Sequence, residues 1–137
     1  MIGEDPAGLL VRLLLWLLAA YHLVMGAIAV LAPSTAPRIM RALYGASVVE
    51  GPHLRYMTSM IGALAIAIGG LSAVAALSPA ANRPIIAALL GLELCRIFCR
   101  IRDRRLLAES FGVSARGNKA AIALLAAESA ILAIGLR

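Results

Sequence analysis

The sequence predicts an all-α integral membrane protein: a four-helix bundle with a short interfacial helix between its first and second spans. Hydrophobic residues make up 62% of the 137 residues, and charged residues only 15%. A soluble domain of this length cannot bury that much apolar surface. Four apolar stretches have about the 20 residues that a helix needs to cross the hydrocarbon core, and none shows the alternation of a membrane β-strand. We therefore expect one domain with four transmembrane helices.

The first predicted span covers residues 9–31 and is followed by a short surface helix. This span is too long for a secretory signal, and acidic residues rather than lysines precede it. Pro33 marks its end, because a proline inside a helix removes a hydrogen bond. Pro37 then favours a new helix start, and the basic and apolar residues after it separate onto different faces. Residues 36–45 are therefore predicted to form a helix on the membrane surface.

The remaining spans are predicted at residues 54–77, 83–101 and 119–136, and the basic residues between spans orient them. Arginine and lysine gather between the first and second spans, and again between the third and fourth. By the positive-inside rule, both of these connections are cytoplasmic and both termini face outward. We assign the charges to topology and to anionic membrane lipid, and we expect no nucleic acid partner.

A candidate site lies at mid-membrane depth. Glu93 and Arg96 interrupt the third span, Glu128 lies near the centre of the fourth, and His22 lies in the first. By the helical rise, His22, Glu93 and Glu128 fall within about 3 Å of the midpoints of their own spans. Arg96 lies about 7 Å from its midpoint, on the cytoplasmic side. A charge at such depth costs about 3 kcal/mol, so these residues usually mark a functional site.

Glu93, Arg96 and Arg100 share one face of the third span, because their spacing is i, i+3 and i+7. In a structural interpretation, Glu93 and Arg96 neutralise each other while Arg100 extends to the interface. In a functional interpretation, Glu128 and His22 find partners across the bundle, since their own helices offer none. If Arg96 pairs with one glutamate, we expect the other carboxyl to be neutral, because burial and a like charge disfavour ionisation.

The functional interpretation makes Glu93 and Glu128 the candidate catalytic acid and base. Arg96 would set their protonation states or bind developing negative charge, and His22 would relay protons. A lone histidine in a span is also often a hydrogen-bonded core residue, so both roles for His22 stay open.

Five further side chains are candidate substrate contacts: Tyr21, Tyr56, Ser59, Arg55 and Arg100. The tyrosines are alternatively packing or interfacial aromatics, and Ser59 can bond back to its own helix. Arg55 belongs with Glu50 and His53 to a cluster at the entry of the second span. That cluster forms either a mouth for a polar ligand or a solvated group of loop residues.

Two cysteines and a run of small residues are assigned to packing. Cys95 and Cys99 lie one turn apart without the further ligands that a zinc site needs, so we expect buried, apolar cysteines. The sequence accordingly predicts no metal and no cofactor. In the second span, Ala65, Gly69 and Ala73 repeat at four-residue spacing, alongside Ala63 and Ala67, and such small residues let helices approach closely.

Short motifs spread over most of the chain resemble a known group. These motifs are Tyr21-His22-Leu23 with Gly26 before Pro33, Arg55 followed by Gly62-Ala63-Leu64 and Gly69, and Cys95-Arg96 before a basic loop. Together they are similar to the DoxX-like group of small four-span bacterial membrane proteins. The resemblance implies a four-span fold in the bacterial inner membrane, and it implies no catalytic residue.

Two classes of function fit the intramembrane charges. The first is an integral membrane enzyme that acts on a lipophilic small molecule by acid/base chemistry: isomerisation, cyclisation or epoxide opening. The second is non-catalytic: a proton-coupled carrier formed by a homo-oligomer, or an accessory subunit whose buried charges pair with a partner. The concentration of acid, base and cation at one depth favours the enzyme.

Overall fold

The computed structural model describes residues 5–45 and 51–137, in which the regular elements are all helices. Three helices are long and apolar enough to cross a membrane: α1 (Pro6–Leu31), α3 (Pro52–Leu77) and α6 (Ala115–Ile134). A fourth, α4 (Arg83–Arg102), has the length of a span, but charged residues interrupt its apolar sequence. The chain is therefore a multi-pass membrane protein, and the four predicted spans match helices within a few residues.

Three short elements connect the long helices. Helix α2 (Ala36–Tyr44) confirms the predicted short helix after the first span, and the 3-10 turn η1 (Pro79–Asn82) joins α3 to α4. Helix α5 (Arg104–Phe111) lies where the sequence pattern indicated only a basic loop. It ends at Gly112, whose φ of 66° is left-handed and favours glycine.

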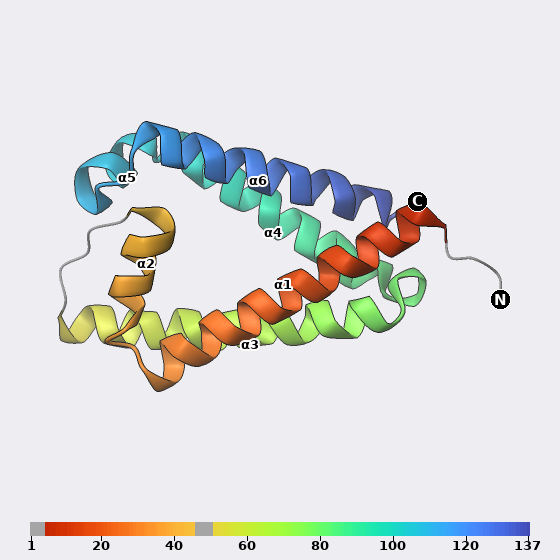
Figure 1. The fold of residues 1–137 in the computed structure, drawn as a ribbon, viewed down its shortest axis with the longest axis horizontal. Coiled ribbons are helices and arrows are strands. Elements are labelled where there is room, and N and C mark those ends of the chain that lie inside the picture. Colours follow the sequence, from red (N-terminus) through yellow and green to blue (C-terminus); the bar gives the residue numbers. More distant parts are fainter. Residues whose placement is uncertain (1–4, 46–50) are drawn as a thin grey trace.

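The long helices form two pairs, which Figure 1 shows meeting at one end and diverging at the other. Helix α1 packs along α3, and α4 packs along α6, while contacts between the two pairs are much sparser. The N-terminal part of α1 and the C-terminal part of α6 lie at the converging end. Helices α2 and α5 lie at the diverging end.

Glycines bring α1 and α3 into close contact. A Cβ added to Gly26 would lie 2.7 Å from the carbonyl oxygen of Gly62, and one added to Gly69 would lie 2.9 Å from the backbone nitrogen of Leu23. Such distances are too short for any side chain, so these backbones approach as closely as glycine permits. The pair α1–α3 therefore depends on a few glycines.

The predicted small-residue stripe of α3 is only partly right. Gly69 is buried as expected, but Ala63 and Ala67 are exposed. Ala65 and Ala73, four residues on either side of Gly69, are half-buried. The packed face of α3 also carries Gly62 and Ala76, which with Gly69 are spaced at seven residues. Seven residues are about two helical turns, so these three positions share one face, whereas Ala63 and Ala67 turn toward the surroundings.

The hydrophobic core sits at the converging end and draws on all four long helices. Its buried members are Val11, Leu14, Leu15, Leu18, Ala75, Ala76, Ile86, Leu89 and Leu132. Arg83 fastens the same end by donating a hydrogen bond to the carbonyl oxygen of Arg137 at 3.0 Å. Many large apolar side chains elsewhere face outward, as expected for a surface covered by lipid. A core of all four long helices thus packs one end, and the helix pairs diverge toward the other.

Candidate functional site

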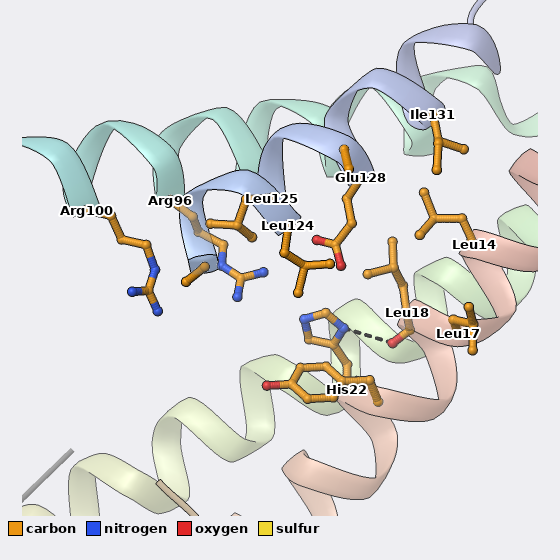
Figure 2. A pocket seen from close by; sticks show the side chains of 13 residues that line it. Leu14, Leu17, Leu18, His22, Arg96, Arg100, Leu124, Leu125, Glu128 and Ile131 are labelled. Carbon is orange, nitrogen blue, oxygen red and sulfur yellow. Dashed lines mark hydrogen bonds between the residues drawn. The ribbon is translucent and has the colours of Figure 1, made fainter. Parts of the chain in front are cut away.

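A cavity of about 410 Å³ lies between α1, α4 and α6, and we call it the central cavity. Its walls are mostly apolar, with leucines from α1 and α6. Its polar lining residues are Tyr21, His22, Arg96, Arg100 and Glu128. Figure 2 shows Arg96, Arg100 and Glu128 pointing from α4 and α6 toward α1, while His22 points from α1 toward them. Five of the predicted site residues, which lie far apart in the sequence, therefore share one cavity.

Glu93 forms the ion pair that the i, i+3 spacing predicts. Only 2% of its side chain is exposed, and Nη1 of Arg96 donates to both of its carboxylate oxygens, at 2.9 and 3.0 Å. Glu93 itself does not line the central cavity, whereas Arg96 does. The ion pair thus neutralises a buried carboxylate and anchors a guanidinium at the cavity wall.

His22 is held by its own helix and presents its second ring nitrogen to the cavity. Its Nδ1 lies 2.8 Å from the carbonyl oxygen of Leu18, four residues earlier. That oxygen can only accept, so Nδ1 is the donor in this hydrogen bond, and Nε2 is the ring nitrogen left for the cavity. Tyr21 packs edge-on against the imidazole, with ring centroids 5.1 Å apart. The structure therefore shows His22 as a hydrogen-bonded histidine that also lines the central cavity, and its role as a proton relay stays a prediction.

Glu128 projects into the cavity from α6. Its carboxylate points toward α1 and the ring of His22 (Figure 2), and it lies within electrostatic range of Glu93 and Arg96. Within residues 5–45 and 51–137, no hydrogen bond or ion pair engages this carboxylate. Glu128 is thus a half-buried carboxyl that is available to a ligand.

Arg100 is tied to a residue that the sequence pattern did not single out. Its Nη1 donates to Oδ1 of Asn118 at 3.0 Å, and Nδ2 of Asn118 donates back to the carbonyl oxygen of Arg100 at 3.1 Å. Asn118 is buried at the start of α6. A polar side chain at the head of an apolar span is the one signal that could have identified it.

Three predicted substrate contacts lie outside the central cavity. Tyr56 is 66% exposed, and Arg55 is exposed near the start of α3. Ser59 donates to the carbonyl oxygen of Arg55 at 3.1 Å, which is the back-bonding alternative. They are separated from the cavity because α3 packs mainly on α1, and its first turns lie at the diverging end. His53 is exposed there as well, and Glu50 lies outside the described residues.

The prediction for the cysteines was wrong. Cys95 and Cys99 are free thiols, and both are exposed rather than buried. Helix α4 turns Ile86, Leu89 and Glu93 inward, which places the cysteines on its outer face. In the part of the chain that the structure describes, no group of three or more histidine, cysteine or acidic side chains is arranged to hold a metal ion.

Comparisons with known proteins identify no relative of this chain. No family model matches the sequence, and no curated protein or solved structure matches it significantly. The similarity to the DoxX-like group therefore stays a prediction from short motifs, and the candidate site is defined by its geometry alone.

Proposed function

We propose that this chain is an integral membrane enzyme that acts on a lipophilic small molecule by proton transfer in the central cavity. The observation that carries the proposal is the convergence of Glu128, His22 and Arg96, from three helices, on one cavity with apolar walls. A carboxyl and an imidazole are common general acids and bases, and a fixed guanidinium stabilises negative charge that develops on a substrate.

The cavity's size and lining support a small, lipophilic molecule as the substrate. Its volume of about 410 Å³ suits a small molecule rather than a polymer. Leu14, Leu17, Leu18 and Leu124 provide apolar contacts, so the molecule is lipophilic and can enter from the bilayer. A polar group at the reacting end of the molecule would lie toward Arg96, and its reacting carbon or oxygen would lie between Glu128 and His22.

The proposed chemistry is an isomerisation, a cyclisation or an epoxide opening. Nε2 of His22 accepts a proton from the substrate, while the protonated carboxyl of Glu128 donates one at a second atom. Return of the proton from His22 to Glu128 restores the starting state, so an isomerisation needs no co-reactant. Glu93 takes a positioning role here, because Arg96 bonds both of its carboxylate oxygens. This changes the acid and base from the two glutamates to Glu128 and His22.

Deuterium labelling tests the proposal for any lipophilic substrate that exchanges a proton. Detergent-purified protein is incubated in D₂O with a bacterial membrane lipid extract, and new deuterium in lipophilic compounds is followed by mass spectrometry. We expect labelling of one compound class, slowed at least about 100-fold in Glu128→Gln and in His22→Gln. Cys95→Ser, on the outer face of α4, is the control and should label normally. Equal labelling by all variants, or none by the unaltered protein, would refute the enzyme.

One observation favours the non-catalytic alternative of a proton-coupled carrier. Leu14 and Leu18 belong both to the core and to the lining of the central cavity, so the core closes the cavity on the side of the packed end. A carrier, alone or as a homo-oligomer, would couple ligand movement to titration of Glu128. Proteoliposomes containing a pH-sensitive dye distinguish the two, since a carrier acidifies the lumen when ligand moves and an isomerase does not.

A further inference from the structure

A second cavity, of about 510 Å³, lies among the end of α4, helix α5 and the start of α6. Four cationic side chains line this basic cavity: Arg100, Arg104, Arg105 and Lys119. Within the described parts of the chain, Glu109 is the one carboxylate in its lining. The basic cavity therefore carries excess positive charge that a bound anion would neutralise.

A neighbouring carboxylate does not offset this charge, because it is already engaged. Asp103, between α4 and α5, accepts hydrogen bonds from Nε and Nη2 of Arg102 at 2.9 and 2.8 Å. These bonds hold the pKa of Asp103 below its usual range, so it remains ionised and paired with Arg102. Neither residue lines the basic cavity.

Arg100 joins the basic cavity to the central cavity, because it lines both. Its reciprocal hydrogen bonds with Asn118 hold the end of α4 against the start of α6. On one side of Arg100 lie the cations of Arg104, Arg105 and Lys119, and on the other lie apolar walls. A ligand that satisfies both sides has an anionic head and a hydrocarbon part.

We propose that the basic cavity binds the phosphate headgroup of an anionic membrane lipid, whose hydrocarbon part extends past Arg100 into the central cavity. Guanidinium and ammonium groups together are the usual partners of a phosphate, and arginine can bond it through two donors at once. Support for the headgroup site comes from the basic cavity alone. The position of the hydrocarbon part in the central cavity rests on the proposed function.

The spacing along α6 then locates the reacting part of such a substrate. Lys119 and Glu128 are nine residues apart, which is about 14 Å along a helix. A phosphate held beside Lys119 thus lies far from the proposed acid and base. The bond that reacts would belong to a functional group within the lipophilic part of the molecule, such as an epoxide, and not to its headgroup.

Native mass spectrometry of the delipidated, detergent-purified protein tests the headgroup site. Dioleoylphosphatidic acid and dioleoylglycerol are the two probes, since they differ only in the phosphate. The site variant is Arg104→Gln/Arg105→Gln/Lys119→Gln, and all three side chains are exposed, so the protein should fold. The control variant, Arg38→Gln/Arg41→Gln/Arg116→Gln, removes the same charge from exposed residues outside both cavities.

The expected result is preferential binding of phosphatidic acid, weakened about 100-fold by the site variant and less than about threefold by the control. Equal weakening in both variants would refute the site in favour of a diffuse basic surface, and equal binding of dioleoylglycerol would refute a headgroup site. Displacement of the lipid by inorganic phosphate near the lipid's own Kd would identify a free phosphate site instead. Lipid binding and deuterium labelling are separate measurements, so a failure of the headgroup site and a failure of the proposed enzyme can be told apart.

Discussion

At the scale of single residues, the ion pair between Glu93 and Arg96 is the charged interaction that involves the most deeply buried carboxylate described. Glu93 is almost completely buried, and Arg96 supplies its hydrogen bonds. A buried carboxylate without its cation is strongly unfavourable, whereas removal of both charges can be nearly neutral. The effects of removing Glu93 and Arg96 on stability are therefore not additive.

We expect Arg96→Gln to destabilise the protein on the order of 3 kcal/mol, because the carboxylate of Glu93 would lose its partner. The double variant Glu93→Gln/Arg96→Gln should recover most of this loss. Thermal unfolding in dodecyl maltoside, followed by circular dichroism, measures both effects. Arg102→Gln breaks an exposed ion pair with Asp103 and should not change the midpoint measurably. A double variant less stable than Arg96→Gln would contradict this account.

Contacts between side chains on one helix could be predicted from the sequence. Which side chains from different helices line the same cavity could not. The i, i+3 spacing of Glu93 and Arg96 determines their contact, since both lie on one helix. The bond between Arg100 and Asn118 joins residues 18 apart on two helices. Their meeting depends on how α4 and α6 are rotated against each other, and nothing in the pattern of either helix specifies that rotation.

At the scale of elements, the long helices were predicted well because length and apolarity decide a membrane span. Helix α5 was missed because its eight residues carry two arginines and a glutamate, which masked the short apolar pattern of Leu106 and Leu107. The cysteines of α4 were misplaced for a related reason. An apolar helix in a membrane has apolar residues on its packed and its lipid-facing sides, so composition does not distinguish them.

Adjacent glycines in α3 provide a matched test of the contact with α1. Gly69→Ala places a Cβ against the backbone of Leu23 and should cost about 1–3 kcal/mol. Gly70→Ala meets nothing within 4 Å and should be neutral or stabilising by up to about 1 kcal/mol. The difference between their thermal midpoints in the same detergent measures the contact, and equal midpoints would mean that α1 and α3 are not closely packed there.

At the scale of the whole molecule, the predicted four-helix arrangement is realised as two pairs that share a core at one end. The central cavity lies between the pairs, and Arg96 and Arg100 line it from the half of α4 that leads to the diverging end. The basic connections predicted to be cytoplasmic, which contain α2 and α5, lie together at this end. We therefore expect the diverging end to face the cytoplasm of a bacterial inner membrane, with both termini outside.

Cysteine labelling in intact and permeabilised cells tests this orientation. In a Cys95→Ser/Cys99→Ser background, Glu109→Cys should react with an impermeant maleimide only after permeabilisation, because α5 would be cytoplasmic. Asp5→Cys should react in intact spheroplasts, because the N-terminal end of α1 would face outward. Reaction of Glu109→Cys in intact spheroplasts would show that α5 and the basic cavity face outward, which is the opposite of the predicted topology.

The sequence by itself determined the membrane class and the long helices, and it predicted a mid-membrane depth for Glu93, Arg96, Glu128 and His22, because these follow from hydrophobic length and helical rise. Only the tertiary structure decided which of these groups share a cavity. It placed Glu93 behind Arg96, brought Glu128 and His22 to the same space, and left Tyr56 and Arg55 outside. The physical reason is that rotation and pairing of membrane helices depend on close backbone contacts, such as those at Gly26, Gly62 and Gly69, and not on hydropathy.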